Sequence, residues 1–180
     1  MKKKIALSIA AIALVICCAV GGTLAWLTDK TGPVTNTFTV GNIDITLAES
    51  ENLDLKMVPG NTITKDPKVT VEGGSEACWL FVKVEKSTNF DSFLTYTIDT
   101  GWTALTGVDG VYYREVAAST TDQAFAVLAD DQVTVKNTVT KANMDGLTSS
   151  GATLPTLTFT AYAVQKAGFT TADDAWAEAE

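Results

Sequence analysis

Residues 77–85, ACWLFVKVE, decide the fold class of this chain of 180 residues. Alternate side chains of an extended strand face opposite sides. Both sides of this stretch are apolar, with Cys78, Leu80, Val82 and Val84 on one and Trp79 and Phe81 on the other. Such a strand is expected at the centre of a sheet that is covered on both faces. Within it, we expect Cys78 to be a buried apolar side chain and not a reactive thiol.

The rest of the chain repeats this extended pattern, with 28 threonines that often alternate with apolar residues. Alternation predicts further strands at residues 35–47, 68–72, 93–99, 111–116, 132–139 and 157–165, with Gly41 as a bulge or bend in the first. Turns are expected at residues 73–74, 101, 109–110 and 145–146. Residues 121–128 fit a helical turn or a strand equally well.

The predicted fold is all-β, an antiparallel jelly-roll-like β-sandwich with a short C-terminal helix. A parallel α/β fold would need amphipathic helices between the strands, and the sequence lacks them. The helix is expected at residues 171–180, where Thr171 is a suitable cap and acidic residues follow it.

The N-terminus has the pattern of a cleaved signal peptide. Three lysines precede an uncharged apolar run at residues 5–20, and small residues at Thr23 and Ala25 predict cleavage between Ala25 and Trp26. A retained anchor is the alternative, but the run is shorter than the ~20 residues that span a membrane. A lipoprotein is disfavoured, because Ile16 or Cys17 would precede the lipidated cysteine. The predicted organisation is a signal peptide at 1–25, an N-terminal segment with the first strand at 26–47, and a β-sandwich domain at 48–180.

Charge and cysteine content limit the function of the mature chain. Cleavage removes three of the 13 basic residues and none of the 21 acidic ones, so the mature formal charge is −11. An acidic surface disfavours binding to nucleic acid and to anionic lipid. Cys78 is the one cysteine left after cleavage, so no disulfide can form within the mature chain.

No catalytic, cofactor-binding or metal-binding residues are predicted. The sequence contains no histidine, which removes Ser-His-Asp and Cys-His catalysis and the HExxH zinc site. Asp130-Asp131 and Asp173-Asp174 lack the spacing of a calcium loop, and we expect them to be solvated. A hydrolase that uses a pair of carboxylates is left open, because only their separation in space matters.

Tryptophans offer a test for a binding module. Trp79, Trp102 and Trp176 are expected to pack in the core or to anchor the helix. Exposure of Trp79 or Trp102 in a concave face would favour a carbohydrate or protein ligand, and burial of both would disfavour one.

Several stretches together resemble the TasA/camelysin family of secreted Gram-positive proteins. They are GGTLAWLTD at the leader's end, TNTFTVGNIDITL, VPGNTITKDPKVTV and LTFTAYAVQ. The resemblance implies processing by a SipW-type signal peptidase, and a jelly-roll subunit that polymerises into fibres of the biofilm matrix. It also implies that each chain binds further copies of the same chain, with other matrix proteins as further candidate partners. The metallopeptidase activity ascribed to camelysin-type members has no histidine on which to rest here, so we expect no enzyme.

In such fibres, the resemblance implies that the segment exposed by cleavage is donated to the sheet of the next subunit. The matching segment is residues 26–47, and its candidate donor side chains are Phe38, Val40, Ile43, Ile45 and Leu47. The alternative for these residues is an ordinary first strand of their own domain. The predicted function is therefore a secreted structural subunit of extracellular fibres, with a monomeric binding module as the alternative.

Overall fold

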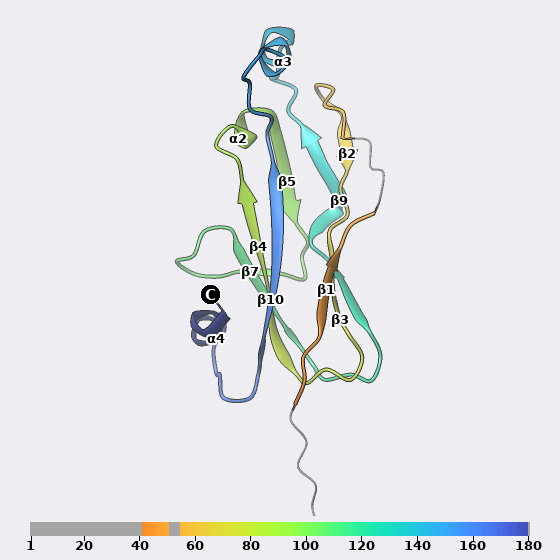
Figure 1. Cartoon of the computed structure of the whole chain (residues 1–180), viewed down its shortest axis with the longest axis vertical. Helices are drawn as coiled ribbons and strands as arrows, with labels where there is room; N and C mark the ends of the chain where they lie inside the picture. Colours follow the sequence, from red (N-terminus) through yellow and green to blue (C-terminus); the bar gives the residue numbers. More distant parts are fainter. Residues whose placement is uncertain (1–40, 51–54, 180) are drawn as a thin grey trace, which may run out of the picture. The chain divides into compact units, whose positions relative to one another are not determined.

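The computed structural model describes residues 41–50 and 55–179 (Figure 1). Across these residues the chain forms ten strands and three helices. The strands are β1 (Ile45–Ala48), β2 (Thr62–Thr64), β3 (Lys68–Val71), β4 (Cys78–Lys86), β5 (Leu94–Ile98), β6 (Thr103–Ala104), β7 (Val111–Val116), β8 (Gln123–Ala126), β9 (Leu128–Val135) and β10 (Leu157–Gln165). The helices are α2 (Phe90–Phe93), α3 (Lys141–Leu147) and α4 (Ala172–Ala179).

Every strand pairing is antiparallel, which confirms the predicted all-β class with a short C-terminal helix. One sheet has the order β10-β4-β7-β6. The others, β1-β3-β8 and β2-β9-β5, join end to end because β2 leads into β3 and β8 into β9. Asp130 and Asp131, near the start of β9, adopt positive φ angles of 55° and 53°.

The strand ACWLFVKVE lies in the interior of its sheet, as predicted. β4 pairs with β10 from Cys78–Gln165 to Lys86–Leu157, and with β7 on its other side. Its two faces contact different clusters. The residues in the core between the layers are Cys78, Leu80, Val82 and Val84. Trp79 and Phe81 face the opposite way, into a cluster that Trp176 of α4 also joins.

Helix α4 covers the outer face of this sheet through contacts with β10 and β4 (Figure 1). The Thr171 hydroxyl accepts a hydrogen bond from the Asp174 amide at 3.2 Å, so the predicted cap is present. Trp176 is 5% exposed. Among the described residues, no helix has the length and hydropathy needed to cross a membrane.

Several local predictions differ from the structure. The turn predicted at Asp145 and Gly146 is wrong, because both residues lie in α3. The strand predicted at residues 132–139 starts earlier, at Leu128, and ends at Val135, because Val139 closes a turn by donating its amide to Lys136. Residues 123–126 form the strand β8, so the stretch 121–128, which fitted a helical turn or a strand, contains a strand. The short elements β2, β6 and α2 were not predicted.

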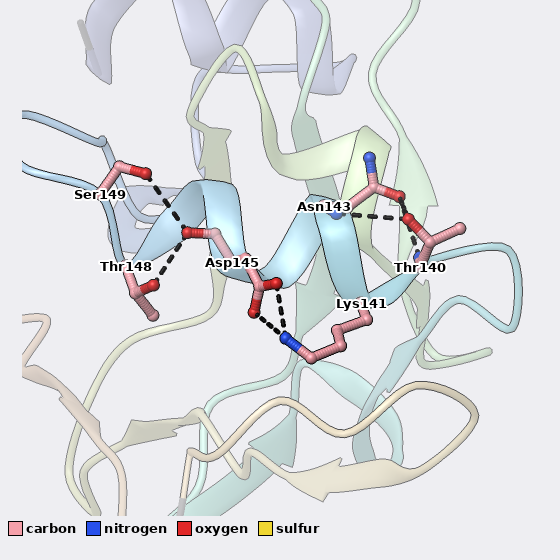
Figure 2. Close-up of polar contacts among 6 residues, drawn as sticks. All are labelled: Thr140, Lys141, Asn143, Asp145, Thr148 and Ser149. Carbon is pink, nitrogen blue, oxygen red and sulfur yellow. Dashed lines mark hydrogen bonds and ion pairs between the residues drawn. The ribbon is translucent and has the colours of Figure 1, made fainter.

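Polar contacts at both ends explain why α3 continues through the expected turn (Figure 2). The Thr140 hydroxyl accepts from the Asn143 amide, and the Asn143 side chain accepts from the Thr140 amide, which is a capping box. Lys141 and Asp145 form an ion pair at 2.6 Å, one turn apart. Thr148 and Ser149 donate their hydroxyls to the Asp145 carbonyl at the C-terminal end.

Candidate functional site

An apolar groove of about 470 Å³ opens between β2 and the start of β10. Both are edge strands, each with a strand neighbour on one side only among the described residues. The buried part of the groove is formed by Ile63, Phe90, Leu94 and Val133. Leu55 and Leu154 also line it and are 55% and 59% exposed, so the groove is an open apolar surface.

The groove begins where β1 ends. Among the described strands, β1 pairs with β3 alone, from Ile45 opposite Val71 to Ala48 opposite Lys68, and none of them pairs with β2 on that side. An edge strand exposes unpaired backbone N–H and C=O groups. Within residues 41–50 and 55–179, the groove therefore combines an apolar lining with the edges of the two strands β2 and β10.

Polar contacts hold the chain in place at this end of the groove. Lys65 lines the groove and forms an ion pair with Glu49 at 2.7 Å, with the two side chains 16% and 34% exposed. The Lys65 ammonium also lies 5.5 Å from the centre of the Phe159 ring. Ser50 donates from its hydroxyl and its amide to the Asp66 carboxylate, and both hydrogen bonds lower the pKa of that group.

The structure describes three of the predicted donor residues. Ile43 and Ile45 are half-buried and pack against the core of their own domain, and Leu47 is 37% exposed on β1. In the single chain, β1 thus pairs within its own sheet, and its donation to another subunit stays a prediction. Phe38, Val40 and the expected cleavage junction Ala25–Trp26 lie outside the described residues.

The groove itself was not predicted from the sequence. Its lining comes from residues between 55 and 157, in segments that are far apart in the chain. The available signal was the exposed leucines, but apolar residues at single surface positions are common and carry little information.

The tryptophans do not form a binding face. Trp79 is 5% exposed and Trp102 is 7% exposed. The Trp102 indole N–H donates to the carbonyl of Ala126 at 2.7 Å and thereby bridges the two layers. Both tryptophans are therefore buried, which disfavours a carbohydrate or protein ligand at these two residues.

Cysteine and acidic residues were examined for a buried thiol and for metal-binding groups in the part of the chain that the structure describes. Cys78 is fully buried, as predicted, and burial raises the pKa of its thiol to about 11. No group of three or more histidine, cysteine, aspartate or glutamate residues in that part is arranged to hold a metal ion. The absence of an enzymatic activity remains a prediction.

Comparison with known proteins agrees with the resemblance in the leader and the early strands. A family model described as camelysin metallo-endopeptidase matches residues 1–92. No curated protein and no solved structure matches the chain. The family model covers just over half of the 180 residues. The chain therefore belongs to the TasA/camelysin family.

Proposed function

We propose that this chain is a secreted structural subunit of extracellular fibres in the biofilm matrix. In this proposal, the N-terminal segment of one subunit occupies the groove of the next. Family membership and the signal-peptide pattern support export and a role in the matrix. The observation that carries the assembly mechanism is the open apolar groove between the edge strands β2 and β10.

A strand from another subunit suits this groove. Strand addition satisfies the backbone groups of a sheet edge, while alternate side chains enter the pockets beneath. Residues 31–40, TGPVTNTFTV, contain no charged residue, and Val34, Phe38 and Val40 share one face of an extended strand. We place the donated part in residues 26–40, upstream of β1, because Ile43 and Ile45 pack against their own core.

The direction of β1 favours a neighbour's segment over the chain's own. Ile45, at the start of β1, lies opposite Val71, whereas the groove is lined by Ile63. Ile63 and Val71 belong to different strands, β2 and β3, and to different sheets. The carbonyls of Asn42 and Asp44 accept from the amides of Glu76 and Glu72, so the described chain just before β1 lies beside residues 72–76 and not beside Ile63. A contact between unlike surfaces that repeats from subunit to subunit produces an open filament.

Export and processing complete the proposal. We propose that a SipW-type signal peptidase cuts between Ala25 and Trp26, and that the donor segment becomes free only then. Residues 26–40 would link subunits, and the sandwich would include β1, which pairs with β3 in its own domain. N-terminal sequencing of the secreted protein tests this step, and a mature chain that still carries residues 1–25 would contradict it.

The assembly mechanism predicts which variants form fibres. The mature chain starting at Trp26 is expected to form fibres that electron microscopy detects. A chain starting at Gly41 should stay monomeric in size-exclusion chromatography, since it lacks the donor. Fibres of the shorter chain, or a mature chain that stays monomeric over a wide range of pH and salt, would contradict the proposal.

Substitutions in the groove test the acceptor separately. Burial of the exposed part of Leu55 or Leu154 under a donated strand should contribute about 1–2 kcal/mol each to the free energy of assembly. The double variant Leu55→Glu, Leu154→Glu should therefore raise the protein concentration needed for assembly more than about tenfold. Val58→Glu is the matched control, because Val58 is 50% exposed and does not line the groove. Equal effects of the control and the double variant would argue against the groove as the acceptor.

A further inference from the structure

A second cleft, of about 530 Å³, lies at the other side of the sandwich, between β5 and β7. β5 is the edge strand farthest from β2 in the order β2-β9-β5. The cleft is lined by Lys86 at the end of β4, Asp91 of α2, residues 95–98 of β5 and Tyr112 of β7. It shares no lining residue with the apolar groove.

The lining of this cleft is mainly polar, whereas that of the groove is mainly apolar. Four of the cleft's seven lining residues carry a hydroxyl group: Thr95, Tyr96, Thr97 and Tyr112. Thr95 and Thr97 are exposed, whereas Tyr96 and Tyr112 are half-buried against the same core cluster. Ile98 is the single apolar member of the lining. Each hydroxyl both donates and accepts hydrogen bonds. The cleft is therefore suited to a polar ligand.

The two charged residues of the lining neutralise each other. Lys86 Nζ lies 2.7 Å from Asp91 Oδ2, and the two side chains are 38% and 67% exposed. The pair still offers further donors on the ammonium and acceptor sites on the carboxylate. The lining therefore has no excess positive charge for an anionic ligand, and the acidic mature chain repels one.

Both tyrosines of the lining are half-buried and pack against the core. The Tyr96 ring packs edge-on against Phe90, with ring centres 5.8 Å apart. Burial, Tyr112 and Asp91 raise the Tyr96 pKa to about 12, so its hydroxyl keeps its proton at physiological pH. Within the described residues, neither the Tyr96 nor the Tyr112 hydroxyl has a hydrogen-bond partner. Half-buried hydroxyls without a protein partner are free to bind a ligand or water.

We propose that this cleft binds one or two residues of a neutral carbohydrate. A sugar residue presents several hydroxyls that donate and accept, which matches a lining of hydroxyls and one neutralised ion pair. The volume lies within the range of roughly 300–1,000 Å³ that is usual for ligand sites. The proposal is independent of fibre assembly, since the cleft and the groove share no residue, and it gives an assembled subunit a means of holding polysaccharide.

Saturation-transfer difference NMR tests the proposal on the mature chain, whether or not it assembles. The probes are maltotriose, cellotriose and tri-N-acetylchitotriose, with trigalacturonate as a charged comparison. At least one neutral trisaccharide should bind saturably and more tightly than trigalacturonate. The absence of saturable binding by all three, or tighter binding of trigalacturonate, would overturn the proposal.

Variants that remove one hydroxyl locate the site. Tyr96→Phe and Tyr112→Phe should each weaken binding by about two- to tenfold, the usual effect of one lost hydrogen bond. Tyr113→Phe is the matched control, because Tyr113 neighbours Tyr112 but packs in the cluster on the opposite face of the sheet. Thr97→Val, at an exposed lining position, repeats the test without altering the core. Unchanged affinity in the Tyr96, Tyr112 and Thr97 variants would overturn the assignment.

Discussion

Replacement of Trp176 by alanine should destabilise the protein strongly, because this ring attaches α4 to the sheet. The Trp176 ring centre lies 5.2 Å from that of Phe81 and 5.1 Å from that of Tyr162. α4 has eight residues, and isolated helices of that length are not stable in water. Its helical structure therefore depends on the packing of Trp176, with Ala172 and Ala175 as the other buried residues.

The size of the effect follows from the buried surface. A buried tryptophan removes roughly 150–250 Å² from water, which at about 25 cal/mol per Å² corresponds to about 4–6 kcal/mol. That figure is an upper bound, since the unfolded chain also buries some apolar surface. Collapse of the site after truncation lowers it further, and measured values for this type of substitution are about 3–5 kcal/mol. We expect Trp176→Ala to reduce the free energy of unfolding by about 3–5 kcal/mol.

Urea unfolding followed by far-UV circular dichroism measures this change. The unfolding curves should be compared at several protein concentrations, so that self-assembly does not contribute to the difference in the free energy of unfolding. Glu178→Ala is the control on the same helix, because Glu178 is exposed, and its effect should stay within about 0.5 kcal/mol. A loss below about 1 kcal/mol for Trp176→Ala would refute the reasoning that this ring holds α4 on the sheet.

Three further predictions concern single groups. Cys78 should react with a thiol reagent at pH 8 only after denaturation, because the side chain is buried and its thiol pKa is about 11, and rapid labelling of the native protein would contradict its placement. Asp130→Val should lower the free energy of unfolding in urea by about 1–2 kcal/mol, because Asp130 has a φ of 55°. Asp130→Gly should be neutral or stabilising, since glycine adopts this φ without strain, and similar losses for both variants would contradict the backbone argument. The pKa of Asp66 should lie below 3.8 in an NMR titration, because the Ser50 hydroxyl and amide both donate to the carboxylate. It should rise in Ser50→Ala, because alanine lacks the hydroxyl and keeps the amide. Since the folded pKa is lowered, this contribution to stability is present at neutral pH and is lost as the pH falls through the lowered pKa; an unchanged pKa in Ser50→Ala would exclude this cause.

Strands that carry their own signal were predicted well from the sequence. The limits of β7 and β10 agree with the predicted ones, because alternation of apolar and polar residues is a local property of an extended chain. β4 was identified as central because both its faces are apolar. The short elements β2, β6 and α2 were not predicted, because a segment of four residues or fewer is too short to show a periodic pattern. In α3, an Asp-Gly pair resembled a turn, and the capping box used Asn143 where glutamate or glutamine is usual.

Neither the groove nor the cleft could be predicted in this way. Each takes its lining from several elements that meet only when the two layers pack. Leu154 and Tyr112 are ordinary residues in the linear sequence, and their meaning comes from the side chains beside them in space. The donor side chains, by contrast, were named from alternation and family resemblance alone. Ile43 and Ile45 pack against their own core, and the proposed role of Phe38 and Val40 depends on a second subunit.

Mixing two assembly-deficient variants tests the central claim, strand donation between subunits, most directly. The mature chain with Leu55→Glu and Leu154→Glu keeps its donor segment and loses its acceptor groove, while the chain starting at Gly41 keeps the groove and loses the donor. Each alone should be monomeric in native mass spectrometry, and the mixture should contain a one-to-one heterodimer and no longer species. Mixtures that remain monomeric, or that form longer polymers, would contradict the account.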